Sequence, residues 1–243
     1  MRAKYALTIA SWLAFLSAIP GALAQGSRGI FVTPIANQPF MAVVDEQRTS
    51  FQPDGTALAM KTIHAIARST QGQIYNESRP LVPASFSGTP PIRVMHIYDP
   101  QTRLNTFLYP QQKTGWQGRT PHPPSTVPPD LYATPTANSL PSNQFTKDED
   151  LGTQTMEGVT VHGVRETQII PAAQNGTAKE VMVTDEYWYS DELRLNMLVK
   201  HNDPRTGSVT TTVTQVTRTE PDAAIFEIPS GYKLDGPAVQ AAP

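Results

Sequence analysis

The stretch RLNMLVKH-NDPRTG-SVTTTVTQVTR, residues 194–218, indicates the fold more clearly than any other part of the chain. Two runs rich in aliphatic and β-branched residues flank a turn that contains Pro204 and Gly207. Pro fixes one φ and Gly accepts a positive φ, so this turn is predicted to close a β-hairpin and to set the register of its strands. Residues 208–219 hold six Thr and three Val, a composition typical of a strand and unfavourable in a helix.

The same alternation of strand-like runs and turn signals extends over most of the chain. The further runs cover residues 40–51, 56–68, 73–82, 91–98, 103–109, 159–170 and 180–190. Residues 56–68 also contain helix formers, but their apolar positions form no single helical stripe, so a strand is the prediction. Residues 191–193 are expected to form the bend between two strands. The pattern predicts a mainly β protein, a single curved antiparallel sheet or half-barrel with a Pro-rich insertion and little helix.

The N-terminal 24 residues have the three parts of a secretory signal peptide. Arg2 and Lys4 provide the positive start, an apolar run follows, and Ala22-Leu23-Ala24 forms a small-x-small cleavage site before Gln25. A membrane anchor is the alternative, but the run is shorter than the about 20 apolar residues of a spanning helix. The sequence therefore predicts cleavage after residue 24 and a periplasmic or secreted protein, with no transmembrane segment after cleavage.

The rest of the chain divides by composition. Residues 25–38 are expected to form an extended lead-in, residues 39–234 a single β domain, and residues 235–243 a disordered tail. Residues 119–150 hold seven Pro, which favours an irregular Pro-rich loop between the two halves of the domain. A surface spacer is the simpler interpretation because few of its residues are apolar, and a lid over a cavity is the alternative.

Composition and motifs exclude several classes of function. The net charge is −2, from 19 basic and 21 acidic residues without a basic run, which argues against a nucleic-acid partner. The chain has no Cys, which excludes disulfides, a lipoprotein anchor and Cys-ligated zinc. It has no Gly-x-Ser-x-Gly elbow, no dinucleotide-binding Gly motif and no phosphate loop. We therefore expect no enzyme and no cofactor.

The titratable residues show no catalytic or metal-binding spacing. The five His residues are at positions 64, 96, 122, 162 and 201, and no two of them have the spacing of a local metal motif. Asp185 and Glu186 are adjacent, so on a strand they point to opposite faces and do not form an acid–base pair. One of them is expected to be exposed and the other paired. Residues 148–150 are expected to form a solvated acidic loop. Neither catalytic nor metal-binding residues are predicted.

Alternation in residues 180–199 identifies the candidate ligand-binding residues. It places Met182 and Trp188 on one face of their strand, opposite Val183 and Tyr187. On the following strand, Leu198 lies on the face that should point to solvent. Packing in the core is the simpler interpretation of such residues, and lining a ligand groove on the concave side of a curved sheet is the functional one. The candidate ligand-binding residues are thus Trp188, Met182 and Leu198.

Several segments resemble known families when they are taken together. They are Pro39-Phe40-Met41-Ala42, Asp54-Gly55, Ala67-Arg68-Ser69, Gln71-Gly72, Glu186-Tyr187-Trp188-Tyr189-Ser190-Asp191-Glu192-Leu193, Asp203-Pro204-Arg205-Thr206-Gly207, Glu220-Pro221-Asp222 and Phe226-Glu227-Ile228-Pro229-Ser230-Gly231-Tyr232. Over residues 39–234 the chain resembles a family of uncharacterised secreted acidobacterial proteins. Its ending is similar, more weakly, to the last strand of periplasmic lipoprotein carriers and of the related sigma-factor regulator domain. The second resemblance implies an open, curved antiparallel sheet around an apolar cavity.

Two functions follow as hypotheses. The first is a non-enzymatic periplasmic binding or carrier module for an apolar or amphipathic ligand such as a lipid or lipoprotein. The second is an envelope protein that recognises another protein through a sheet edge or the Pro-rich loop, because exposed edges add strands and polyproline segments dock in aromatic grooves.

Overall fold

The computed structural model describes residues 30–120, 145–176 and 178–236 of the 243-residue chain. The predicted signal peptide, residues 1–24, lies outside the described residues. So do residues 25–29, 121–144 and 237–243, which belong to the predicted lead-in, Pro-rich loop and tail. No helix within the described ranges is long and apolar enough to cross a membrane.

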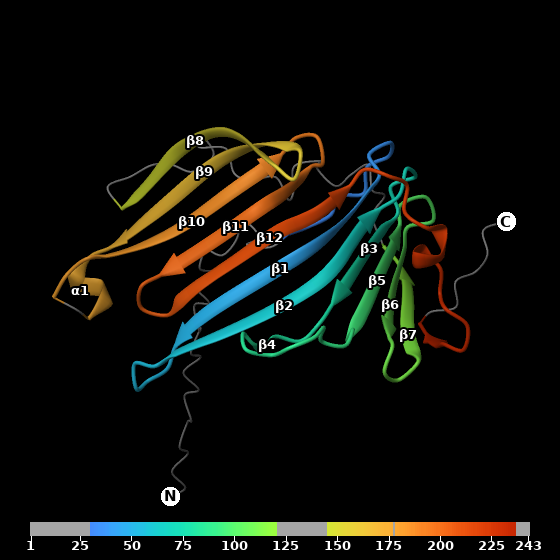
Figure 1. Ribbon diagram of the computed structural model, residues 1–243, viewed down its shortest axis with the longest axis horizontal. Helices are drawn as coiled ribbons and strands as arrows, with labels where there is room; N and C mark the ends of the chain where they lie inside the picture. The colour runs from blue at the N-terminus through green and yellow to red at the C-terminus, as the bar shows by residue number, and fades with distance from the viewer. Residues whose placement is uncertain (1–29, 121–144, 177, 237–243) are drawn as a thin grey trace, which may run out of the picture.

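The described residues form one large antiparallel sheet (Figure 1). Its strands are β1 (Phe40–Phe51), β2 (Ala57–Arg68), β3 (Ile74–Ser78), β4 (Val82–Pro83), β5 (Val94–Asp99), β6 (Leu104–Tyr109), β7 (Thr114–Arg119), β8 (Thr146–Met156), β9 (Val159–Ile170), β10 (Val181–Ser190), β11 (Leu195–Asp203), β12 (Gly207–Thr217) and β13 (Lys233–Asp235). Helical structure is limited to α1 (Ala172–Asn175) and the 3₁₀ turn η2 (Ala223–Phe226). The expected mainly β fold with little helix is confirmed.

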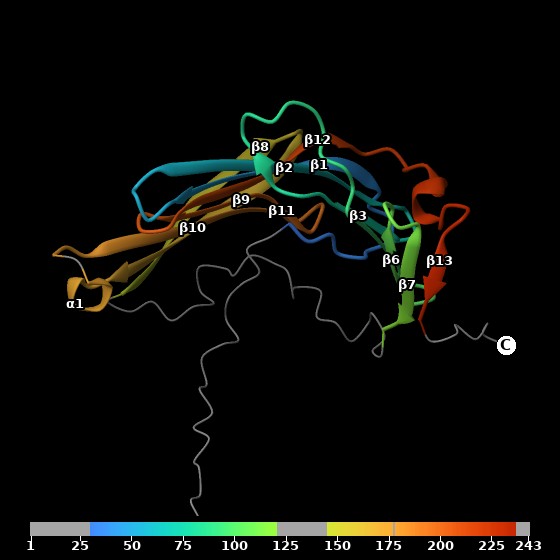
Figure 2. The ribbon, with the colours of Figure 1, turned by 90° about the horizontal axis from the view of Figure 1, so that it is seen from below.

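The two halves of the chain meet in the middle of the sheet. The strand order is β8-β9-β10-β11-β12-β1-β2-β3-β5-β6-β7-β13, and β4 pairs with β2 off this path. β1 lies between β2 and β12, while β7 and β8, which follow one another in sequence, lie near opposite ends. Within the described residues, the strand pairings are antiparallel except that of β13 with β7, which is parallel. Figure 2 shows that the sheet is arched and does not close into a barrel, as the curved half-barrel prediction requires.

Three strands were not predicted from the sequence. β7 and β8 extend from both ends into the stretch 119–150, and β13 includes Asp235, the first residue of the predicted tail. The acidic residues 148–150 belong to β8 and not to a loop. β7 contains two Gly residues and β8 contains four charged residues. These residue types are uncommon in strands, so neither segment has the composition of a strand. The charged residues of β8 are explained by its position at the edge of the sheet, because charges on an edge strand keep it from pairing with other chains.

The hairpin that introduced the sequence analysis forms as expected. β11 and β12 pair antiparallel, with Asp203 opposite Gly207 at the turn and Leu198 opposite Thr212 at the far end. The amide of Thr206 donates to the Asp203 carbonyl over 3.1 Å. Gly207 has a φ of 120°, so the predicted positive φ is confirmed. Asp203 further stabilises the turn, because its carboxylate accepts hydrogen bonds from the backbone and side chain of Arg205.

Two apolar clusters pack on the arch, and the larger one, which also holds Trp188 and Leu198, includes side chains from both faces. The larger one includes Phe40, Val44 and Ile66 of the central strands, and Val32 packs against them from residues 30–39, which run beneath the arch in Figure 2. The smaller one is covered by η2, which packs on Tyr75 and Ile97 from the outer side of the bend. The face that carries Phe40, Ala42 and Val44 is therefore the concave face, and the opposite one is the convex face.

Candidate ligand-binding surface

One row of directly opposed residues runs across the concave face from the centre of the sheet to β7. The row consists of Ala42, Ile66, Asn76, His96, Phe107 and Trp116. Directly opposed residues of antiparallel strands share a face, so all six belong to the concave face. The row begins in the buried core at Ala42 and ends at Trp116, whose side chain is 42% exposed.

The outer end of this row is an exposed aromatic patch, formed by His96, Phe107, Tyr109 and Trp116. The rings of His96 and Phe107 are stacked with centroids 4.5 Å apart, and those of Phe107 and Trp116 are 6.1 Å apart. Tyr109 alternates with Phe107 along β6, so it faces the same side, and it is 40% exposed. A Cβ at Gly118 would lie 2.2 Å from the Trp116 indole, which shows that the ring lies over this glycine. The patch is preorganised by ring contacts, and it remains open to solvent.

The sequence-predicted residues Trp188 and Leu198 lie on the other face. Trp188 opposes Leu198, Leu198 opposes Thr212, and Thr212 opposes Asp45, so these four residues share one face. Asp45 is adjacent to Val44 on β1, and adjacent strand residues point to opposite faces. Trp188 and Leu198 therefore lie on the convex face, and both are buried, as the core-packing interpretation expected.

Trp188 packs over a glycine, and Met182 is the exposed member of the predicted site. A Cβ at Gly163 would meet three atoms of the Trp188 indole at 2.7 Å. Met182, on the same face of β10, is 50% exposed. A ligand-binding role for Trp188, Met182 and Leu198 stays a prediction, but it concerns the convex face and not the concave one.

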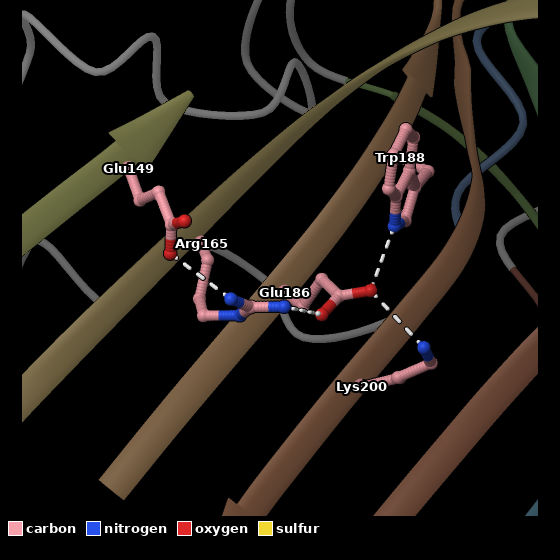
Figure 3. Close-up of polar contacts among 5 residues, drawn as sticks. All are labelled: Glu149, Arg165, Glu186, Trp188 and Lys200. Atoms are coloured by element: carbon pink, nitrogen blue, oxygen red, sulfur yellow. Dashed lines mark hydrogen bonds and ion pairs between the residues drawn. The ribbon is translucent and has the colours of Figure 1, made fainter. Parts of the chain in front are cut away.

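Charged residues of alternating sign form a ladder beside Trp188 on the convex face (Figure 3). Glu149, Arg165, Glu186 and Lys200 oppose one another across β8, β9, β10 and β11. Arg165 bridges Glu149 and Glu186 over 2.9 and 3.0 Å, and Lys200 and the Trp188 indole donate to Glu186 over 3.0 and 2.8 Å. Burial alone raises the pKa of Glu186, but these three donors together hold it below its ordinary value. The ladder fixes the register of four strands.

Asp185 and Asp150 are paired with histidines, whereas both buried carboxylate oxygens of Asp148 have no partner among the described residues. Asp185 and Glu186 point to opposite faces as expected, but neither is exposed: Asp185 is buried, and its Oδ1 lies 2.8 Å from Nδ1 of His201. In β8, Asp150 lies 2.7 Å from Nε2 of His162, and this hydrogen bond lowers the pKa of Asp150. Within the described residues, no group of three or more His, Asp or Glu side chains is arranged to hold a metal ion.

Arg68 is a buried cation that the sequence analysis did not single out. It ends β2 opposite Phe40, on the concave face, and it is completely buried. Its guanidinium carbon lies 4.9 Å from the centre of the Phe40 ring. The signal available in the sequence was the charge at the end of the run Ala65-Ile66-Ala67, since an Arg there is either solvated or held by specific partners.

Comparison with known proteins gives similarity at the level of fold. No family model matches the chain, and no curated protein matches its sequence. Among solved structures, MucB is 8% identical, with a TM-score of 0.37 over 82% of this chain and 60% of the MucB chain. LprF from Mycobacterium bovis is 12% identical, with a TM-score of 0.30 and coverage of 76% and 89%. A LolA superfamily protein from Nitrosomonas europaea is 11% identical, with a TM-score of 0.21 and coverage of 80% and 92%.

The expected weak similarity to lipoprotein-carrier-like proteins is found, and all three TM-scores lie below 0.5. The chain spans about 60% of the length of MucB. The likeness is one of chain arrangement alone, so the functional argument below is drawn from the residues of this protein.

Proposed function

We propose that the protein is an exported, non-enzymatic binding module that holds an apolar or amphipathic ligand against the concave face of its sheet. The aromatic patch is the observation that carries this proposal. Large apolar side chains that remain in water and are continuous with a core mark binding surfaces more often than chance exposure does. Trp116 and Tyr109 have this character, and the row from Ala42 to Trp116 connects them to the buried floor.

The proposal is tested by calorimetric titration of the full chain with 1-dodecanol, an uncharged amphiphile. Trp116→Ala is expected to weaken binding about tenfold or more, because loss of one large apolar contact is worth at least about 1.4 kcal/mol. Met182→Ala is the matched control, since it also removes an exposed apolar side chain, but from the convex face. Unchanged affinity is expected for this control.

Three outcomes separate the alternatives. Weaker binding by Met182→Ala with an unchanged Trp116→Ala would move the site to the sequence-predicted residues on the convex face. Equal effects of both variants would show that neither face is specific. No binding of dodecanol to the wild-type protein would overturn the proposal.

Export is the second part of the proposal. It rests on the tripartite pattern of residues 1–24, and N-terminal sequencing of exported material is expected to begin at Gln25. An intact Met1 on a membrane-bound product would contradict it.

A protein-interaction module remains the alternative function, with the outer edge of β8 as the docking element. β8 is 11 residues long and pairs with β9 on one side, at the end of the strand order. Its acidic residues and the register shift between Asp150 and Gly152 are features that discourage strand addition, so we favour the ligand-binding function. Protection of β8 amides from hydrogen exchange by a copurifying protein would support the alternative.

A further inference from the structure

Arg68 has hydrogen-bonding capacity that the described part of the chain does not use. Its Nε donates to the Gln38 carbonyl over 2.8 Å, and its Nη1 donates to the carbonyls of Thr33 and Leu193 over 2.9 and 3.0 Å. Its Nη2 is buried and has no hydrogen-bond partner. Buried polar atoms are nearly always paired, so an orphaned guanidinium nitrogen requires an explanation.

Among the residues that the structure describes, no carboxylate forms an ion pair with Arg68. All three acceptors of its hydrogen bonds are backbone carbonyls. Burial lowers the pKa of Arg68 to about 10, and the positive charges of Arg218 and Arg194 contribute in the same direction. A guanidinium without a counter-ion is costly to bury, and a carboxylate or phosphate would offset that cost with two parallel hydrogen bonds.

Two adjacent rows of the concave face lead from Arg68 to the aromatic patch, and they contain polar Asn76, Asn105 and His96 beside apolar side chains. Arg68 belongs to a row that continues through Ile74 and Tyr98 to β6 and β7, directly beside the row that ends at Trp116. Four strand steps separate β2 from β7, or about 19 Å along the sheet at the usual strand spacing. The cation and the exposed aromatic rings thus lie at two ends of one strip of mixed apolar and polar side chains. An anionic head at Arg68 and an apolar tail over Tyr98, Phe107 and Trp116 match this arrangement.

The segment 30–39 lies against Arg68 but outside the sheet. It has no strand pairing, and it is held by the packing of Val32, by the bonds from Arg68 to Thr33 and Gln38, and by the bonds from Thr33 to Arg194 and from Asn37 to Thr70 over 3.0 and 2.8 Å. Such a segment opens at lower cost than a paired strand does. Its displacement frees the Nε and Nη1 hydrogens that the carbonyls of Gln38 and Thr33 accept, on the same guanidinium as the unpaired Nη2.

We propose that Arg68 binds the carboxylate or phosphate head of an amphipathic ligand, whose apolar tail lies along the concave face toward Trp116, when residues 30–39 are displaced. This inference rests on the proposed function and adds the charge of the ligand to it. The residues that bind the tail and the residue that binds the head are different, so the two can be tested separately.

The test compares three probes on the wild-type full chain: dodecanoate, 1-dodecanol and acetate. We expect dodecanoate to bind at least tenfold more tightly than dodecanol, and acetate to show no binding at the same concentrations. Equal affinity for dodecanoate and dodecanol would overturn the role of Arg68 but leave the proposed function standing. Absence of binding by both would overturn the two together, and acetate as tight as dodecanoate would show a site for free anions and overturn the amphipathic ligand.

Variants locate the effect. Arg68→Met keeps the length of the apolar stem, and it should abolish the preference for dodecanoate over dodecanol, whereas Arg68→Lys should retain part of it. Arg165→Met is the matched control, because it removes a guanidinium from the convex face; the tenfold preference should persist. Loss of the preference in Arg165→Met, or its persistence in a folded Arg68→Met, would contradict the assignment. The wild-type comparison decides the question even where Arg68→Met does not fold.

Discussion

Substitution of Gly207 by Ala should destabilise the sheet at the junction of its two halves. Gly207 is the first residue of β12, and it opposes Asp203 in the hairpin and Ser50 of β1. Its φ of 120° lies in a region that L-residues rarely adopt. A Cβ there would lie 1.9 Å from the carbonyl oxygen of Thr49 and 2.9 Å from Cα of Ser50. Both are backbone atoms, so no side chain can rotate away, and the strands must separate locally.

The expected loss is about 2–5 kcal/mol of the free energy of unfolding. Holding a residue other than Gly at this φ costs about 1–3 kcal/mol. Separation of the strand ends also removes one or two hydrogen bonds, at about 1 kcal/mol each; one of them is the bond from the Phe51 amide to the Thr206 carbonyl, 3.3 Å long. The sum is a large part of the about 5–15 kcal/mol that keeps a typical protein folded.

Urea unfolding followed by circular dichroism and Trp fluorescence measures the effect, with Gly158→Ala as the matched control. Gly158 also has a positive φ, 73°, in the turn between β8 and β9, but no heavy atom lies within 4 Å of the added Cβ. It should lose only about 1–2 kcal/mol, the cost of the left-handed conformation. If Gly207→Ala and Gly158→Ala lower the midpoint equally, with unchanged m-values, the contact with Thr49 has no energetic weight and the reasoning is refuted.

Three further predictions concern titration and packing. Glu186 has a lowered pKa in the folded protein, so its charge stabilises the fold above about pH 4.5 and this contribution is lost as the pH falls further. Glu186→Gln should cost about 1 kcal/mol of the free energy of unfolding at pH 7, and stability should then depend less on pH in the acid range. Burial lowers the pKa of His64, so stability should fall as pH drops below about 6.5, and His64→Gln should remove this part of the dependence in urea titrations from pH 7 to 5. Gly163→Ala should displace the indole of Trp188 from its bond to Glu186, at about 1–2 kcal/mol, and red-shift its emission; an unshifted spectrum would contradict the stacking.

The sequence was sufficient for the strands whose side chains alternate over a core. The limits of β1 and β9 coincide with the predicted runs 40–51 and 159–170, because their apolar positions recur every two residues between clear turns. β7 and β8 lack this pattern, since one has little side chain to bury and the other lies at an edge. Their strand conformation depends on the neighbours with which they pair, and a single sequence does not show these.

Alternation also could not tell which face of the sheet is concave. It placed Trp188 and Leu198 correctly on one face, but the curvature depends on bulges such as that between Trp188 and Tyr189 in the β10–β11 pairing. Trp116 was not identified as a candidate because β7, the strand that carries it, was not predicted. The partners of Arg68 are beyond any local pattern, since the carbonyls of Thr33 and Leu193 are 35 and 125 residues away in sequence.

Two energetically unfavourable features fall on the concave face, and their coincidence is the main reason to place the function there. The lowered pKa of Arg68, about 10, corresponds to roughly 3 kcal/mol against its charged form. On the same face Trp116 and Tyr109 keep large apolar surfaces in water. On the convex face, the charges of Glu149, Arg165, Glu186 and Lys200 are paired in a ladder. Selection for stability alone favours buried rings and paired guanidinium groups. Exposed rings at Trp116 and Tyr109 and an unpaired guanidinium at Arg68 fit a face to which a ligand binds.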